Sequence, residues 1–226
     1  MKHFLLSFVS VIALLASFAA SEEYDDSFWP KSYYVRANIG AMFTNGDLNE
    51  RAITIKDTAG TKMKVYPPDM SVFAVPGITL GANVRSFSVD VTFQYATFEE
   101  SQTDNPDSDE RGTLFWNVGF EFTYNLFWPD DFQIGLGGGY TLNTVKANHS
   151  SPLDGKTYRS EFVGASAGFV ANVKYYFTDF LAVVPSFRLY EGWFKKVYTT
   201  PSENYDLNPY LWQTFISANI ALQLQF

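Results

Sequence analysis

Cysteine is absent from this chain of 226 residues, and histidine occurs only as His3 and His149. A chain without cysteine has neither a disulfide framework nor a thiolate metal site, and two imidazoles are too few for an ordinary histidine-ligated metal. Basic residues are also scarce, because 16 lysines and arginines stand against 24 acidic residues and leave a formal net charge of -8. We therefore expect no metal, no cofactor and no nucleic-acid partner, since nucleic acids are bound by basic surfaces.

Long hydrophobic runs are missing after the first twenty residues, so no later segment is expected to cross a bilayer as a helix. Even so, 46% of the residues are hydrophobic and 18% are aromatic, with a mean hydropathy of -0.09. The apolar content excludes a disordered chain, and the mean hydropathy excludes a helical membrane protein. Aromatic richness without net hydrophobicity is the property that the fold must explain.

The beginning of the chain has the form of a secretory signal peptide. Lys2 precedes an apolar run over residues 4–20, and small residues and then acidic ones follow. The small residues after which cleavage is expected are Ala19, Ala20 and Ser21. The predicted organisation is a signal peptide, residues 1–21, and one mature domain, residues 22–226. A retained membrane anchor is the alternative, and the short apolar core without a following basic cluster argues against it.

The mature chain is a series of alternating segments, most clearly over residues 210–226. Large apolar side chains at even positions, from Trp212 to Phe226, alternate there with a more polar set at odd positions. A period of two indicates a β-strand whose two faces meet different surroundings. The stretches with this pattern predict eight strands, at about 33–43, 72–85, 87–98, 113–126, 132–142, 160–177, 180–190 and 210–226.

The connections between these strands alternate in length. The short ones are Arg85-Ser86, 127–131 and Thr178-Asp179, and the long ones are 44–71, 99–112, 143–159 and 191–209. An even number of strands, with turns at one end and loops at the other, is typical of bacterial outer-membrane barrels. The predicted fold class is all-β, an eight-stranded antiparallel up-and-down transmembrane β-barrel with short periplasmic turns and long extracellular loops. Residues 52–56 and 62–66 predict an additional hairpin within the first loop, beyond the lipid.

A secreted, soluble barrel would also show alternating strands, and side-chain volume separates the two alternatives. The interior of an eight-stranded barrel is only wide enough to be filled by side chains. The apolar face carries several Trp, Phe, Tyr and Leu side chains per strand, too many for that interior, whereas Gly, Ser, Thr, Asn and Gln of the other face fit it. We therefore expect the bulky face to contact lipid, with aromatic girdles at Tyr33, Tyr34, Phe127, Trp128, Tyr175, Tyr176, Phe177, Phe180 and Phe226 and at Phe43, Phe98 and Trp212.

The last residues, Ile220, Leu222, Leu224 and Phe226, form the pattern of a C-terminal assembly signal, a final Phe preceded by apolar residues at alternate positions. With its signal peptide and eight strands, the mature chain resembles the small outer membrane protein A-like and X-like barrels. The resemblance implies a bacterial outer-membrane location, contact with outer-membrane lipid and lipopolysaccharide, and insertion by the barrel assembly machinery. The chain ends at Phe226 without the peptidoglycan-binding domain of the A-like members, so a role in tethering the cell wall is not expected.

Five charged residues are predicted to point into the lumen: Arg36, Asp90, Glu121, Lys174 and Arg188. All but the last lie within about five residues of the periplasmic rim, counted along strands that rise about 3.3 Å per residue. Because buried charges are tolerated only when they are paired, we interpret the set as an ion-pair network that closes the lumen. A narrow porin, in which the same charges line a path for small solutes, is the alternative.

The long loops are candidates for an interaction with an unidentified extracellular ligand. The second loop is acidic and lacks the spacing of a calcium loop. The fourth loop combines aromatic residues with two lysines, a composition that suits a partner or a glycan as well as simple packing of an extended hairpin. Its residues are Trp193, Phe194, Lys195, Lys196, Tyr198 and Tyr205.

An enzymatic interpretation depends on His149. Ser150 and Ser151 follow it and Glu161 lies ten positions on, a set that faintly resembles the arrangement of the lipid A 3-O-deacylase barrels. Pro152 and Asp154-Gly155 make the surroundings those of a polar loop, and we assign no catalytic residue. The sequence thus predicts a structural or surface-interaction barrel, with a narrow porin and a lipid A-modifying enzyme as alternatives, and leaves the oligomeric state open.

Overall fold

The computed structural model describes residues 32–49, 53–56, 62–65, 70, 72–84, 86–101, 110–127, 131–150, 157–199 and 203–226. The predicted signal peptide, residues 1–21, lies outside these residues, and so does most of the acidic second loop. Within the described ranges, no helix is long and apolar enough to cross a lipid bilayer.

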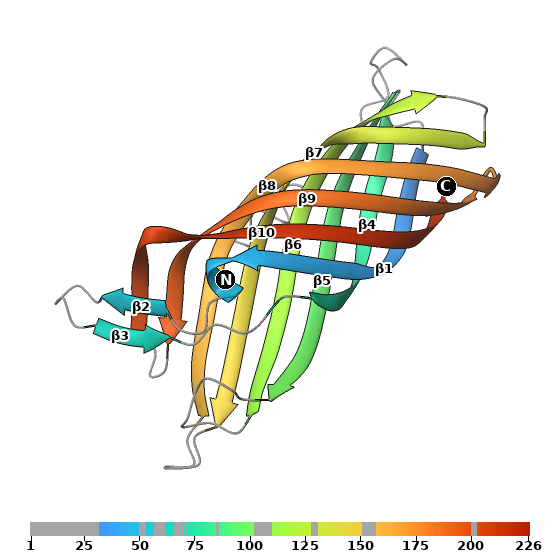
Figure 1. Ribbon diagram of the computed structural model, residues 1–226. Coiled ribbons are helices and arrows are strands. Elements are labelled where there is room, and N and C mark those ends of the chain that lie inside the picture. Colours follow the sequence, from blue (N-terminus) through green and yellow to red (C-terminus); the bar gives the residue numbers. More distant parts are fainter. Residues whose placement is uncertain are drawn as a thin grey trace, which may run out of the picture.

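Eight long strands close into one antiparallel barrel, as predicted (Figure 1). They are β1 (Ser32–Gly46), β4 (Val72–Val84), β5 (Phe87–Ser101), β6 (Glu110–Phe127), β7 (Phe132–Ser150), β8 (Thr157–Thr178), β9 (Leu181–Thr199) and β10 (Glu203–Gln225). Each strand pairs with its neighbours in the chain order, and β1 pairs with β10 to complete the circle. Two backbone hydrogen bonds of 2.9 Å between Tyr33 and Phe226 extend the pairing of β1 with β10 to the last residue of the chain. Phe226 therefore helps to close the barrel.

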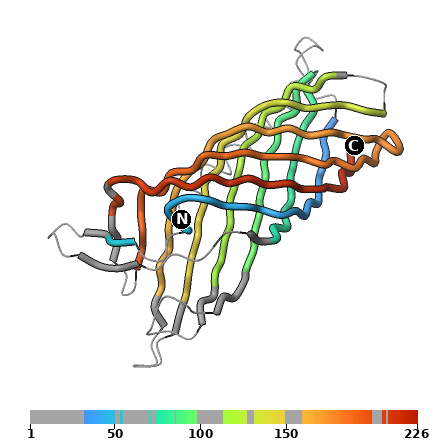
Figure 2. Tube along the Cα trace, viewed as in Figure 1, coloured from blue at the N-terminus to red at the C-terminus, as the bar shows by residue number. Residues whose placement is uncertain are grey.

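The two ends of the barrel differ, and we name them by their connections. At the turn end two residues join β4 to β5 and β8 to β9, and the C-terminus of β10 lies at this end (Figure 1). At the loop end the strands extend well beyond the predicted boundaries. Figure 2 shows β8, β9 and β10 running side by side along the barrel, in orange to red. Most of the predicted loops 143–159 and 191–209, and both ends of 99–112, are therefore strand.

The reason for these wrong boundaries is that backbone pairing continues where the apolar alternation fades. The ladder of β7 and β8 runs to Ser150 opposite Thr157, and that of β9 and β10 to Thr199 opposite Glu203. The predicted hairpin of the first loop is present as β2 (Ile53–Lys56) and β3 (Lys62–Val65), which form a separate two-stranded sheet. A short 3-10 helix, η1 (Asp47–Asn49), precedes it.

The outer face of the barrel is apolar and the inner face is largely polar in the half nearer the turn end. Ile220, Leu222 and Leu224 are 54%, 51% and 52% exposed, whereas the intervening Gln223 is fully buried. Large apolar side chains are exposed in the same way on all eight strands of the barrel. Because such side chains gain by leaving water, a surface of this kind requires a nonaqueous environment.

The aromatic residues at the rims follow the prediction in part. The side chains that are exposed on the outer face are Tyr33, Phe43, Tyr175, Phe177, Phe180, Trp212 and Phe226. Tyr34 was predicted as a girdle residue, and this is wrong, because its alternation with Tyr33 turns it into the lumen, where it is 1% exposed. Tyr176 likewise faces inward and packs against Ala182 and Val184. The side chains of Phe98, Phe127 and Trp128 lie outside the described residues.

The lumen at the loop end is apolar, which corrects the expectation of a polar interior along the whole barrel. Phe115, Phe194 and Phe215 pack there with ring centroids 6.2 and 6.4 Å apart, in a buried cluster to which all eight barrel strands contribute. Leu48 of η1 and Met70 are fully buried in the same cluster. These described residues of the first connection thus add to the apolar filling of the loop end.

Candidate functional site

The five predicted lumen residues are all buried inside the half of the barrel nearer the turn end. Their exposures are 4% for Arg36, 1% for Asp90, 2% for Glu121, 0% for Lys174 and 6% for Arg188. They come from β1, β5, β6, β8 and β9, so the set spans the barrel. We refer to these residues and their hydrogen-bond partners as the lumen network.

The centre of the lumen network is one continuous row of residues in register across seven strands. The row reads Tyr34, Gly81, Asp90, Glu121, Gly139, Gly168 and Tyr190, from β1 through β4, β5, β6, β7 and β8 to β9. The two carboxylates are adjacent in the middle of the row, and a tyrosine stands at each end. Glycines separate each acid from its tyrosine.

Asp90 is held from the β1 side. The Tyr34 hydroxyl donates to Oδ1 of Asp90 at 2.5 Å, and Nη1 of Arg36 donates to Oδ2 at 3.0 Å. The Arg36 guanidinium carbon lies 4.3 Å from the centroid of the Tyr34 ring, and its Nε donates to Oε1 of Gln223 at 2.7 Å. The carboxylate therefore receives a hydrogen bond on each oxygen, and its cation is fixed by a ring and an amide.

Glu121 is held from the β9 side, across the intervening strands. Nε and Nη2 of Arg188 donate to its two carboxylate oxygens at 2.5 and 3.0 Å, a bidentate pair. The Tyr190 hydroxyl adds a bond of 3.0 Å to Oε1, and Nη1 of Arg188 donates to Ser186 at 3.0 Å. Both acids thus have the same kind of environment, one arginine and one tyrosine.

Two glycines provide the space for the hydrogen bonds of Tyr34 and Tyr190 to the carboxylates on other strands. A Cβ atom on Gly81 would lie 2.1 Å from Oδ1 of Asp90 and 2.3 Å from the ring of Tyr34. A Cβ atom on Gly139 would lie 2.2 Å from the hydroxyl oxygen of Tyr190. Since unbonded carbon and oxygen do not approach so closely, a side chain at either position would displace a tyrosine from its carboxylate.

Lys174 occupies a separate part of the lumen network. Its ammonium group donates to Oγ of Ser88 at 2.6 Å and to Oδ1 of Asn83 at 3.2 Å, and it lies 5.6 Å from the centroid of the Tyr34 ring. The sequence places this lysine at the right depth but suggests an acidic partner for it. In the structure its hydrogen bonds go to neutral oxygens.

Sequence reasoning missed the neutral members of the lumen network, Tyr34, Tyr190, Ser88 and Gln223. The parity of the strands identifies all four, because Tyr34 and Tyr190 lie two positions from the inward arginines of their strands, Ser88 lies two from Asp90, and Gln223 is at an odd position of the last strand. The usual place of tyrosine at membrane interfaces favours an outward girdle position for Tyr34. Its alternation with Tyr33 instead predicts the inward position that the structure shows.

The two carboxylates of the lumen network accept hydrogen bonds from two arginines and two tyrosines. Among the residues that the structure describes, no group of three or more histidine or acidic side chains is arranged to hold a metal ion.

The residues of the enzymatic alternative are separated along the strands. The backbone of His149 belongs to β7, opposite Tyr158, and not to a loop, while Glu161 is opposite Lys146. Lys146, the partner of Glu161, lies three residues before His149 on β7, which corresponds to about 10 Å along the strand. Glu161 is therefore not the register partner of His149. The side chains of His149 and Ser150 are outside the described set, as is the whole of Ser151.

No family model and no curated protein matches the sequence. Among solved structures, the chain is similar to Neisserial surface protein A, with 15% identity, 86% of this chain and 97% of the other covered, and a TM-score of 0.48. The outer membrane protease OmpT of Escherichia coli shows 11% identity, 91% and 99% coverage, and a TM-score of 0.46. A major outer membrane protein of Thermus thermophilus shows 10% identity, 86% and 98% coverage, and a TM-score of 0.48. Likenesses at this level concern the chain trace and say nothing of activity.

Proposed function

We propose that this protein is an integral barrel of the bacterial outer membrane, with a closed lumen and a structural or surface-interaction role. The observation that carries the proposal is the inversion of its faces. Buried polar residues such as Arg36, Asp90 and Glu121 fill the axis, while phenylalanine, leucine and isoleucine are exposed around the circumference. A water-soluble barrel places these residue types the other way round.

The closed ladder supports the membrane location. In hydrocarbon an unpaired strand edge would leave N–H and C=O groups without partners, and pairing of β1 with β10 removes both edges. The outward apolar stretch of β10, from Ile216 to Leu224, has about the 9–11 residues that a tilted strand needs to cross a bilayer. The turn end is then periplasmic and the loop end faces outward, as short turns and longer connections are arranged in such barrels.

Closure of the lumen follows from two successive layers. The lumen network, with the Arg36–Asp90 and Arg188–Glu121 pairs, fills the half nearer the turn end. The cluster around Phe115, Phe194 and Phe215 fills the loop end. An eight-stranded barrel has no spare width beyond its side chains, so each layer alone is sufficient to stop hydrated solutes.

The membrane location is tested by fractionation of cells that express the full chain. The folded barrel is expected in the outer-membrane fraction, and it should migrate differently on a denaturing gel before and after boiling, because a closed strand ladder resists detergent. Recovery in the aqueous fraction, with the same migration before and after boiling, would refute the proposal.

Closure is tested separately by conductance in planar bilayers. Wild type and Glu121→Ala are both expected to be silent, because the apolar layer remains in place when the ion pair is removed. Discrete conductance steps from the wild-type barrel would instead support the narrow porin. A change that appears only in Glu121→Ala would identify the lumen network as the sole barrier, contrary to the two-layer arrangement.

A further inference from the structure

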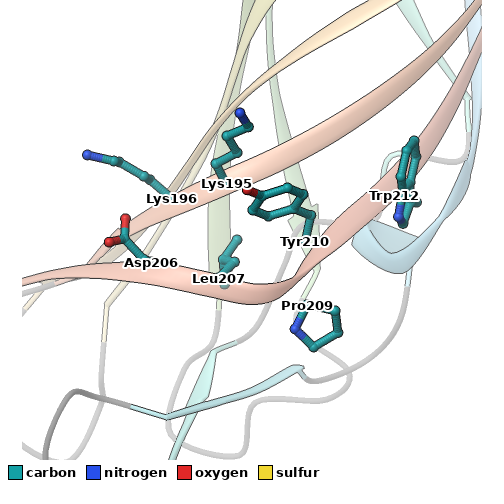
Figure 3. A pocket seen from close by; sticks show the side chains of 7 residues that line it. All are labelled: Lys195, Lys196, Asp206, Leu207, Pro209, Tyr210 and Trp212. Atoms are coloured by element: carbon teal, nitrogen blue, oxygen red, sulfur yellow. The ribbon is translucent and has the colours of Figure 1, made fainter.

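A groove opens on the outer face of the barrel where the pairing of β9 with β10 is interrupted. Asp206 is opposite Lys196, but the next pair joins Leu211 to Phe194, so four residues of β10 face the single residue Lys195. The groove is lined by Lys195, Lys196, Asp206, Leu207, Pro209, Tyr210 and Trp212 (Figure 3).

The irregularity directs two consecutive lysines outward. The register of β8 with β9 also skips Lys195, since Val163 pairs with Lys196 and Gly164 with Phe194. In a regular strand only one of two neighbours faces outward, whereas here Lys195 and Lys196 are both exposed between the buried Phe194 and Val197. A bulge of this kind re-aims side chains at the expense of ladder bonds, and Pro209 within it has no N–H to donate.

Aromatic side chains form the rest of the groove. The Lys195 ammonium lies 5.3 Å from the centroid of the Tyr210 ring, and Tyr210 and Trp212 are 48% and 55% exposed. Figure 3 shows the Lys195 side chain standing over the Tyr210 ring, with Lys196 and Asp206 to one side and Trp212 to the other. Leu207 points inward and anchors the bulge in the apolar cluster.

The position of the groove along the barrel axis indicates which part of the membrane it contacts. On the turn side of the lysines lie Trp193 and Trp212, with ring centroids 6.3 Å apart, and Tyr140 stands 6.3 Å from Trp193. Toward the turn end this aromatic row is followed by Glu191, which accepts a hydrogen bond of 3.0 Å from the Thr214 hydroxyl, and then by the apolar outer face. A row of Trp and Tyr marks the boundary between acyl chains and head groups, so the two lysines are at the level of the head groups.

We infer that this groove binds the phosphate-bearing head group of a lipid in the leaflet at the loop end. Among the residues that line the groove, two are lysines and one, Asp206, is acidic, in a chain whose formal net charge is -8; Asp47 lies beside the groove, where it accepts a hydrogen bond of 2.7 Å from the backbone N–H of Trp212. The groove is continuous with the outer face of the barrel, so a molecule that contacts both surfaces is amphipathic. Its negatively charged group lies at Lys195 and Lys196, and its acyl chains lie on the turn side of Trp212. The inference rests on the proposed membrane location, and it adds a specific site to it.

The test uses the full mature barrel in neutral detergent, titrated with bisphosphorylated lipid A and measured by native mass spectrometry. The variant K195Q/K196Q is expected to bind about tenfold more weakly, because each lysine near a membrane surface contributes appreciably to anionic lipid binding. The matched control is Lys146→Gln, since Lys146 also faces outward toward the loop end but is opposite Glu161. This control should bind like wild type. Dephosphorylated lipid A should bind wild type as weakly as the phosphorylated lipid binds the double variant.

The inference is overturned by equal affinity of wild type and K195Q/K196Q for lipid A, or by equal affinity of wild type for both forms of lipid A. Full displacement of the lipid by millimolar inorganic phosphate would assign the site to a free anion and would also refute the lipid. All variants are first shown to retain the heat-dependent gel migration. A barrel that never enters the outer membrane refutes the proposed function, whereas an inserted barrel with unchanged lipid affinity refutes this inference alone.

Discussion

Asp90 and Glu121 lie directly opposite each other on β5 and β6, two buried carboxylates in register at the centre of the lumen. Like charges at such a position destabilise a sheet. The barrel compensates with one arginine for each acid, Arg36 from one side and Arg188 from the other. The arrangement is stable only while both cations are present, which gives the first prediction.

Arg188→Met should lower the free energy of unfolding by about 3–5 kcal/mol, because it leaves the Glu121 carboxyl group buried without its cation and, among the described residues, with the Tyr190 hydroxyl as its remaining hydrogen-bond donor. The measurement is urea unfolding of the barrel refolded in micelles. The double variant R188M/E121M should recover most of the loss, since a buried pair replaced by apolar residues costs little. A single variant as stable as wild type would show that the pair contributes nothing to folding.

Lys174→Met should change the unfolding free energy by less than about 1.5 kcal/mol, or raise it, because removal of this buried charge leaves no carboxylate unpaired. Its hydrogen-bond partners Ser88 and Asn83 remain joined by their own bond of 2.8 Å. Arg36→Met is the matched comparison and should behave like Arg188→Met, since Asp90 then loses its cation. Equal destabilisation by the lysine and arginine variants would mean that Lys174 also neutralises an acid.

Gly139→Ala should destabilise the barrel by about 1–3 kcal/mol, the usual cost of overpacking, because its Cβ would occupy the position of the Tyr190 hydroxyl. Tyr190→Phe removes that oxygen, so the double variant G139A/Y190F should be more stable than G139A alone. Thermal unfolding of the four proteins forms a double-mutant cycle. A coupling free energy near zero would show that the absence of a side chain at Gly139 is not needed for the position of the Tyr190 hydroxyl.

The strands and the inward charges could be predicted because alternation is a local property. Once Phe120 and Phe122 are assigned to the outer face, Glu121 must face the axis, whatever lies across the barrel. The partners could not be predicted in the same way. The pairing of Arg188 with Glu121 depends on the register of three strand pairs, and single-strand patterns do not contain register.

The loop end was the least predictable region. There the inner positions carry Phe115, Phe194 and Phe215, so both faces of the strands contain large apolar residues and the alternation no longer separates lipid from lumen. The predicted strands therefore stop too early on β7 and β9. The sequence predicts a loop around Lys195 for a related reason, since two consecutive outward lysines break the period of two.

Ile220→Lys should be strongly destabilising in a bilayer, by about 2–4 kcal/mol, if the middle of the outer face contacts acyl chains. Thr214→Lys is the matched substitution nearer the aromatic row on the same strand, and it should cost only about 0–1 kcal/mol. The comparison uses unfolding of the barrel in lipid vesicles. Equal effects at the two depths would contradict the assignment of an apolar membrane band on β10.

Phe226→Ala separates an assembly signal from a structural role of the last residue. The Phe226 backbone hydrogen bonds with Tyr33 survive the substitution, and the Phe226 ring is 75% exposed, so the refolded variant should unfold in micelles like wild type. In cells the same variant should accumulate less in the outer membrane, because the terminal aromatic ring is what the assembly machinery is expected to read. Leu181→Ala, at the turn end of β9, is the control. Its stability in micelles and its accumulation in the outer membrane should not differ from each other in the way that those of Phe226→Ala do. If Phe226→Ala loses stability in micelles as much as it loses yield in cells, the ring acts in packing, and Ile220, Leu222, Leu224 and Phe226 are then simply the lipid-facing side of the closing strand.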